Sequence, residues 1–161
     1  MRVMFDTSVL VAGQIQRHVH HATAWPWLNV AQQGTFKLIV AAHSMAECYA
    51  ILTTLPKPAR IRPVTAAKML ETNVLPFATV TPLLPDDYWS VITQLAADGL
   101  VGGIVYDALG VKAAQLAHAD RLLTFNLKHF RRLWPEGHDK IISPEHVAPS
   151  DLVPPQPPTE D

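Results

Sequence analysis

Short apolar runs alternate along the chain with longer mixed segments that favour helices. The runs are rich in β-branched, aromatic and aliphatic side chains, which is typical of buried strands. They predict strands at residues 3–5, 36–40, 77–80 and 122–125, and a short last strand at 140–143. The segments between them predict helices at residues 6–13, 21–33, 44–54, 65–73, 86–97 and 106–119. This alternation predicts an α/β fold with a mostly parallel central sheet flanked by helices.

The pattern of apolar runs ends before the end of the chain. Residues 144–161 are rich in proline and acids and contain almost no core-forming side chains. Such a composition cannot bury enough apolar surface to offset the entropy of ordering. We therefore expect a single folded domain at residues 1–143 and a disordered tail at residues 144–161.

Composition supports one compact domain and restricts how it could bind nucleic acid. The chain has 161 residues, of which 48% are hydrophobic and 17% charged. This is enough for a sizeable core and too little charge for a disordered protein. The formal net charge is -1. Any binding to RNA must therefore depend on a local basic patch.

The sequence also indicates a cellular compartment. Cys48 is the single cysteine, so no intrachain disulfide can form, which suits a reducing cytosol. Asp6 interrupts the N-terminal segment before the apolar region of a signal peptide could develop. No apolar run approaches the roughly 20 residues that a membrane span needs. We expect a soluble, cytoplasmic protein with no membrane association.

Four polar side chains stand at or just after the carboxyl ends of the predicted strands. Asp6 follows the first strand, and Glu47 lies one turn into the helix after the second. Asp107 opens the helix that follows a glycine-rich break, and Asn126 follows the strand at 122–125. Ligands of open parallel sheets bind beyond these ends. If the sheet is parallel, the four side chains converge on one edge.

Each of these residues also has a structural interpretation. Asp6 could cap the first helix, and Asp107 would be favoured in a first turn by the helix dipole. Ser44-Met45-Ala46-Glu47 matches a capping box, in which Glu47 reaches back to the start of its helix. Asn126 could cap the short helical turn at 127–131. Considered singly, each residue is explained by its local structural role.

Considered together, the three acids indicate a metal-binding catalytic site. Two carboxylates about 4 Å apart repel by roughly 4 kcal/mol at an effective dielectric near 20. A cluster of three is costly unless a cation neutralises it or one acid takes up a proton. Oxygen ligands without cysteine or histidine suit Mg²⁺ or Mn²⁺. Such an ion acidifies a bound water and stabilises charge on a phosphate, so the cluster indicates a phosphodiesterase site.

The four polar residues lie within four short motifs. The motifs are Phe5-Asp6-Thr7-Ser8-Val9-Leu10, Ser44-Met45-Ala46-Glu47, Tyr106-Asp107-Ala108-Leu109, and Leu122-Leu123-Thr124-Phe125-Asn126 with Phe130. In this order and at this spacing they resemble the PIN-domain family, and most closely its VapC-type toxins of bacterial toxin–antitoxin pairs. The resemblance covers about residues 1–143.

The resemblance implies a flat parallel sheet flanked by helices and an acidic pocket that holds one or two Mg²⁺ or Mn²⁺ ions. It implies metal-dependent cleavage of single-stranded RNA, inhibition by a cognate antitoxin protein, and a homodimer. Asp6, Glu47 and Asp107 would be the metal-binding acids. Asn126 stands where many members have a fourth acid, a departure that weakens the case for a second firmly held ion.

Smaller polar residues and basic residues complete the expected site. The resemblance gives Thr7 and Thr124 orienting roles. Two basic clusters could contact RNA phosphates, and the alternative for each is a solvated surface, which is equally favoured only for the cluster in the loop at residues 56–63. The cluster beside the predicted pocket strand is the better candidate. The first cluster is Lys57, Arg60 and Arg62, and the second is Lys128, Arg131 and Arg132.

Several other residues have simpler interpretations. His18, His20 and His21 lack a further ligand in a zinc pattern, which favours a loop. His129 is interpreted as a surface histidine near the site. An apolar patch around Trp25 and Trp27 could bind a partner.

Two other classes of acid-centred α/β protein fit the sequence poorly. A phosphatase with an aspartyl nucleophile usually carries a second aspartate where Ser8 stands, and a receiver domain needs paired acids where Asp6 stands alone. Two alternatives to the toxin stay open. One is a PIN-type nuclease that processes RNA outside a toxin–antitoxin pair, and the other is a non-catalytic binding module on the same fold.

Overall fold

The computed structural model describes residues 1–152 and contains a five-stranded sheet in which all paired strands run parallel. The strand order is β3-β2-β1-β4-β5, so β1 lies at the centre between β2 and β4. The strands are β1 Arg2–Phe5, β2 Lys37–Ala41, β3 Ala78–Thr81, β4 Arg121–Leu123 and β5 Ile141–Ile142. The predicted α/β fold with a parallel sheet is confirmed.

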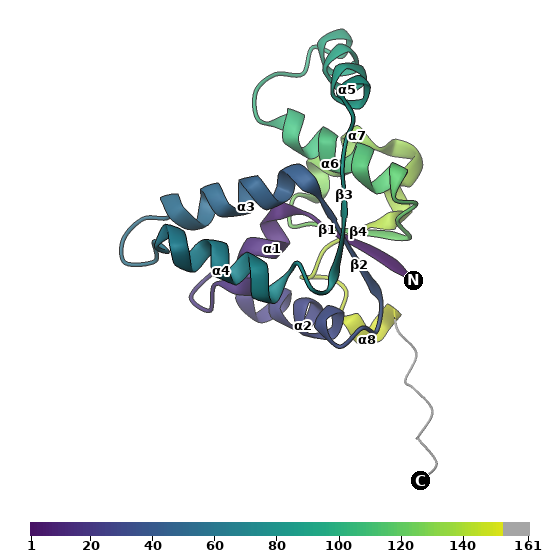
Figure 1. Ribbon diagram of the computed structural model, residues 1–161. Helices are drawn as coiled ribbons and strands as arrows, with labels where there is room; N and C mark the ends of the chain where they lie inside the picture. Colours follow the sequence, from purple (N-terminus) through teal and green to yellow (C-terminus); the bar gives the residue numbers. More distant parts are fainter. Residues whose placement is uncertain (153–161) are drawn as a thin grey trace.

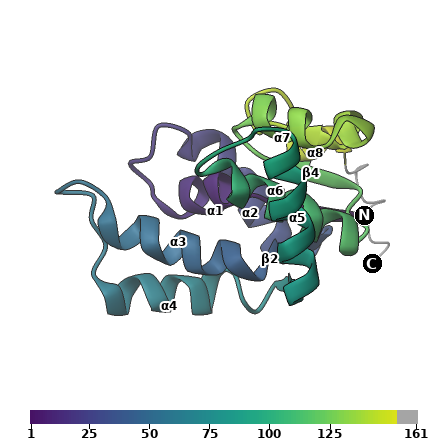
Figure 2. The ribbon, with the colours of Figure 1, turned by 90° about the horizontal axis from the view of Figure 1, so that it is seen from above.

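Helices connect the strands and cover both faces of the sheet (Figure 1). Helices α1 to α4 lie on one side, α6 and α7 lie on the other, and α5 stands out from the body of the molecule (Figures 1 and 2). The helices are α1 Thr7–Gln14, α2 His21–Gln32, α3 Ala42–Thr54, α4 Pro63–Asn73, α5 Pro85–Ala97, α6 Ile104–Leu116, α7 Leu127–Leu133 and α8 Pro149–Leu152, with a short 3-10 helix η1 at Pro135–Lys140.

Two apolar layers hold the helices against the sheet. Successive side chains of a strand point to opposite faces. Val3 and Phe5 therefore belong to the layer that contains Trp27 of α2, whereas Met4 belongs to the layer that contains Phe130 of α7. Because both faces are covered, the strands are continuously apolar, as parallel sheets require.

The start of α3 differs from the prediction. The helix begins at Ala42, directly after β2, and Ala41 is its N-cap without a side-chain cap bond. Ser44 lies inside the first turn and is buried. The predicted capping box of Ser44 and Glu47 is therefore wrong, because the chain enters the helix before the serine is reached. This leaves Glu47 available for other contacts.

The segment predicted as a disordered tail is ordered where the structure describes it. The indole Nε1 of Trp27 donates a hydrogen bond to the carbonyl of Val147 at 3.2 Å. Val147 and Leu152 pack against the apolar layer that contains α2, and Leu152 ends α8. The predicted tail residues 153–161 lie outside the described residues.

The two tryptophans of α2 differ in exposure. Trp27 is fully buried in the core, whereas Trp25 is 43% exposed. The predicted apolar patch around both residues is therefore wrong for Trp27. Among the described residues, no helix has the length and apolar character needed to cross a membrane.

Candidate active site

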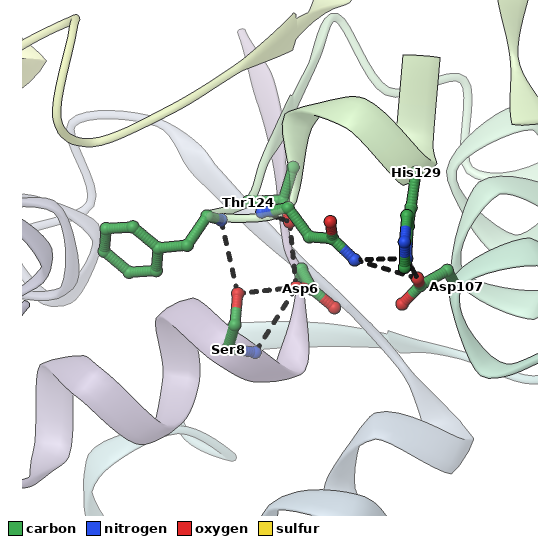
Figure 3. A network of polar contacts seen from close by, with 7 residues as sticks. Asp6, Ser8, Asp107, Thr124 and His129 are labelled. Atoms are coloured by element: carbon green, nitrogen blue, oxygen red, sulfur yellow. Dashed lines mark hydrogen bonds and ion pairs between the residues drawn. The ribbon is translucent and has the colours of Figure 1, made fainter. Parts of the chain in front are cut away.

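Asp6 is held at the carboxyl end of β1 by donors from two elements. Its Oδ2 atom accepts hydrogen bonds from the backbone N of Ser8 at 3.4 Å and from Ser8 Oγ at 2.6 Å. Thr124, which directly follows β4, donates its hydroxyl to the same atom at 3.0 Å. Figure 3 shows this network at the junction of the two strands. Asp6 is the N-cap of α1, as predicted, and it is also tied to the neighbouring strand.

Glu47 reaches the site from the second turn of α3. The hydroxyl of Thr7, the first residue of α1, donates a hydrogen bond to Glu47 Oε2 at 3.0 Å. Thr7 is buried and Glu47 is half-buried. A side chain next to Asp6 in sequence therefore fixes the orientation of Glu47, which links the ends of β1 and β2.

Asp107 lies in the first turn of α6 and is held by two residues of the β4–α7 segment. Asn126 Nδ2 donates to Asp107 Oδ2 at 3.1 Å. The ring nitrogen Nδ1 of His129 lies 3.0 Å from the same oxygen and 2.7 Å from Asn126 Nδ2. Asn126 makes no side-chain cap of α7, so the predicted capping role is wrong.

His129 is a site residue whose role the sequence did not reveal. Its side chain is 49% exposed, yet it contacts Asp107 directly (Figure 3). The sequence feature that could have identified His129 is its spacing of three residues from Asn126. Residues three apart lie on the same side of a helical turn, so a histidine at this position faces the same carboxylate as Asn126.

The three acids influence one another. Burial raises the pKa of Asp6, Glu47 and Asp107 above their ordinary values. The charge of Asp6 raises the pKa of the other two further, and Asp107 adds to the rise at Glu47. The structure therefore brings the three predicted acids together in one region where their negative charges are incompletely balanced.

The donors in this region suit a hard cation. Glu47 and Asp107 each use one oxygen for their contacts with Thr7, Asn126 and His129, and the other oxygen has no hydrogen bond from the described residues. Asp6 accepts through Oδ2 from Ser8 and Thr124, and the backbone N–H of Thr7 also interacts with its carboxylate. Carboxylate oxygens of this kind are the ligands that Mg²⁺ and Mn²⁺ prefer. As the side chains stand, no three His, Cys, Asp or Glu residues within 1–152 are grouped closely enough to hold an ion. Binding would require the free oxygens to turn toward a common point.

His43 is a second residue that the sequence did not identify. It lies one turn before Glu47 on α3, and its Nε2 is 3.9 Å from Glu47 Oε2. Both ring nitrogens are buried, and neither makes a hydrogen bond of good geometry in the described structure. Burial lowers the pKa of His43, against the opposing influence of the Tyr106 backbone and of the Asp6 charge. No sequence motif distinguishes this histidine, because its neighbours are brought to it by other elements.

A cavity of about 560 Å³ opens beside Asp107. Asn126 and His129 line one part of it, and the loop from Gly99 to Ile104 lines another. Arg132 of α7 is also part of its wall. The cavity gives a ligand access to Asp107 from the side of α6 and α7.

The structure separates the two predicted basic clusters. Arg132 borders the cavity beside Asp107, whereas Lys128 is exposed on α7. Arg131 instead turns to β5, where its Nη2 donates to the carbonyl of Ile141 at 3.4 Å. The second cluster therefore contributes one residue, Arg132, to the wall of this cavity.

The cluster of Lys57, Arg60 and Arg62 lies elsewhere. It occupies the loop between α3 and α4, at the end of the helix pair that points away from the sheet (Figures 1 and 2). Arg60 donates through Nε to the carbonyl of Leu55 at 3.0 Å, a contact within this loop. The structure does not bring this cluster to the acids.

A parallel α/β sheet with three mutually repelling carboxylates at its carboxyl edge defines the class of protein. The family model described as PIN domain matches residues 3–133. The chain belongs to the PIN domain family.

Two relatives show which branch of the family the chain is similar to. Ribonuclease VapC40 of Mycobacterium tuberculosis is 36% identical over 127 residues, which cover 76% of this chain and 85% of that protein. Ribonuclease VapC27 of the same organism is 32% identical over 119 residues, which cover 74% of this chain and 80% of that protein. The chain is thus similar to the VapC-type branch of the family, as the motifs predicted.

Solved structures share the fold. FitAcB from Neisseria gonorrhoeae superposes with a TM-score of 0.62 at 15% identity and covers 90% of this chain and 99% of its own. The M. tuberculosis protein VapC20, described as a Sarcin-Ricin loop cleaving toxin, superposes with a TM-score of 0.57 at 16% identity, covering 74% of this chain and 86% of its own. At these identities the likeness concerns the fold alone.

Proposed function

We propose that the chain is a Mg²⁺- or Mn²⁺-dependent endoribonuclease that cleaves single-stranded RNA. The observation that carries the proposal is the convergence of Asp6, Glu47 and Asp107 at the carboxyl edge of the sheet. Burial raises the pKa of all three acids, and Asp107 lines an open cavity. The similarity to proteins named ribonuclease supports RNA as the substrate.

Asp6, Asp107 and Glu47 would hold the ion. When bound, the ion would supply a Lewis acid that acidifies water and neutralises charge on the phosphate. The hydroxyls of Thr7 and Thr124 hold Glu47 and Asp6 by one oxygen each and leave the other oxygen free. These two threonines therefore act as orienting residues.

Asn126 and His129 perform the same task for Asp107. Both contact Oδ2, so they restrict the rotation of the carboxylate and leave Oδ1 for the ion. Arg132, which lines the cavity next to them, would attract a phosphate of the substrate.

The proposed biological role is that of the toxin in a type II toxin–antitoxin pair, with a cognate antitoxin protein as its inhibitor. The support is the similarity to VapC proteins over three quarters of the chain. We also propose a homodimer. Large apolar side chains on α5 are exposed, with Trp89 at 67% and Ile92 at 44%, and offer a surface for it.

Cleavage of labelled single-stranded RNA by the purified protein tests the proposed activity. The reaction is run with Mg²⁺, with Mn²⁺ and with EDTA, beside Asp6→Asn. We expect metal-dependent cleavage that is absent from the variant. Asp139→Asn is the matched control, because Asp139 is fully exposed and precedes β5 at the opposite edge of the sheet.

Two results would count against the proposal. Equal cleavage by the Asp6→Asn protein would show that a contaminating nuclease or a different site is responsible. Absence of both cleavage and metal binding in the folded protein would favour a non-catalytic binding module on the same fold.

A further inference from the structure

A second cavity, of about 750 Å³, lies between α5, α6 and α7. It shares two lining residues, Leu100 and Arg132, with the cavity beside Asp107. The two spaces therefore adjoin at these residues. A ligand that is engaged at the acids and is long enough to pass Arg132 would continue into the second cavity.

The floor of the second cavity is apolar. Leu95 of α5 and Val111 of α6 line it and are almost completely buried, at 7% and 5% exposure. Polar groups are placed at its rim. Gln115 is exposed, and its amide has no hydrogen-bond partner among residues 1–152. An apolar floor with an amide at the rim suits a nucleobase, which is apolar on its faces and polar at its edge.

The charges distinguish the place of a base from the place of a phosphate. Asp98 and Glu136 also line the second cavity and would repel a phosphate inside it. The ammonium of Lys112 is 3.5 Å from Asp87, whose negative charge opposes the attraction of a phosphate to the lysine. Arg132, by contrast, is exposed and has no carboxylate partner in the described structure. A phosphate is therefore favoured at Arg132, between the two cavities, and an uncharged base is favoured beyond it.

We propose that the cavity between α5, α6 and α7 is a nucleobase subsite of the RNA strand. In this arrangement the scissile phosphate lies at the acids, the neighbouring phosphate lies at Arg132, and the next base enters the second cavity, where Gln115 reads its edge. The proposal rests on the proposed function, because it takes RNA as the ligand. It adds a source of base preference at one position beside the cleaved bond.

Photocrosslinking locates the base directly. The probe is a set of short single-stranded RNAs in which one 4-thiouridine occupies each position in turn, and the protein is the inactive Asp6→Asn chain. We expect the nucleotide on one side of the cleavage position to crosslink to peptides that contain Leu95 or Gln115. Crosslinks confined to other surfaces, or no crosslinks, would overturn the proposal.

Base preference gives the second readout. Cleavage of an RNA pool with randomised sequence around the cleavage position is compared for the unsubstituted chain, for Gln115→Ala and for Gln33→Ala. Gln33 is an exposed glutamine at the end of α2 and serves as the matched control. We expect Gln115→Ala to change the preference at one flanking position several-fold, and Gln33→Ala to leave it unchanged. An unchanged preference in Gln115→Ala would contradict base reading by this residue.

The two readouts separate failure of the subsite from failure of the nuclease. Crosslinking needs binding alone, whereas the pool assay needs catalysis. Metal-dependent cleavage without crosslinks in the second cavity would overturn the subsite and leave the nuclease. Crosslinks in the second cavity without any cleavage would overturn the nuclease and retain the subsite as part of an RNA-binding module.

Discussion

At the scale of single residues, the acids are oriented by hydroxyl donors that come from other elements. Ser8 and Thr124 bind one oxygen of Asp6, and Thr7 binds one oxygen of Glu47. These hydrogen bonds lower the pKa of their acids, but burial has the larger effect and the net pKa is raised. The ionised acids are therefore oriented for ligand binding, and their burial lowers the stability of the metal-free folded protein.

Asp6→Asn is expected to stabilise the metal-free protein at neutral pH. Because the folded pKa of Asp6 is raised above its ordinary value of 3.8, the ionised acid favours the unfolded chain. Its contribution to folding is fully present below the unfolded pKa and is lost as the pH rises through the folded pKa. Asparagine removes the charge and keeps an acceptor for Ser8 and Thr124.

Urea unfolding in EDTA measures this effect. The free energy of unfolding of Asp6→Asn should exceed that of the unsubstituted chain at neutral pH, and the difference should shrink as the pH falls toward 3.8. The difference between the two proteins isolates Asp6 from the buried histidines that also titrate. Asp139→Asn, with its exposed side chain, should show no difference. A less stable Asp6→Asn protein at neutral pH would contradict the argument.

Glu47→Gln separates a role in the site from a role in the helix. Glutamine still accepts the hydrogen bond of Thr7, and no capping box depends on the glutamate. We expect cleavage to fall by about 100-fold, as is typical when a preorganised charged group is removed. The melting temperature should be unchanged or raised, because burial raises the pKa of Glu47. Glu71→Gln on α4 is the control, and a loss of stability specific to Glu47→Gln would indicate a structural role.

At the scale of elements, the parallel pairing of β1 with β4 explains why distant residues meet. This pairing places the turn after Phe5 beside the turn after Leu123. The predicted strands and the rule that parallel strands end at one edge were sufficient to bring Asp6, Glu47 and Asn126 together. Asp107 follows α5 and no strand, so its place in the site depends on the packing of α6. Within these elements, the capping roles predicted for Ser44 and Asn126 from local sequence signals were wrong, because the backbone takes a different course there.

The elements that the sequence did not predict correctly have specific physical reasons. Ser44 resembles an N-cap, but the chain turns directly from β2 into α3 at Ala42, and the serine is buried in the first turn. The roles of His43 and His129 depend on Glu47 and Asp107, which tertiary structure brings to them. Contacts between elements leave no periodic signal in the sequence.

The segment after β5 is expected to stabilise the domain. A chain that ends at Ser143 loses the Trp27–Val147 hydrogen bond and the packing of Val147 on the core. Val147 is partly buried, so its packing contributes about 1 kcal/mol, and the hydrogen bond contributes about 1 kcal/mol. We expect a loss of roughly 2 kcal/mol in urea unfolding. A chain that ends at Leu152 is the control for the loss of residues 153–161, and equal stability of both truncated chains would contradict the prediction.

At the scale of the whole molecule, α5 has two different faces. One face lines the cavity next to α6, through residues such as Val91 and Leu95. The other face exposes Trp89 and Ile92, together with Leu84 just before the helix. A helix that projects from the body and exposes several large apolar side chains is unfavourable in isolation, so its outer face is a suitable contact for a second copy of the chain.

Trp89→Glu is expected to weaken the proposed homodimer. Buried tryptophans at interfaces contribute about 2 kcal/mol or more to binding, which corresponds to roughly a 30-fold change in Kd. Light scattering during size-exclusion chromatography should show a dimer for the unsubstituted chain and a monomer for Trp89→Glu at the same concentration. Trp25→Glu is the matched control, because Trp25 is also exposed but lies on α2. Dissociation by Trp25→Glu alone would place the interface on α2 instead. A monomer in all three proteins would exclude the homodimer and leave the outer face of α5 to another partner.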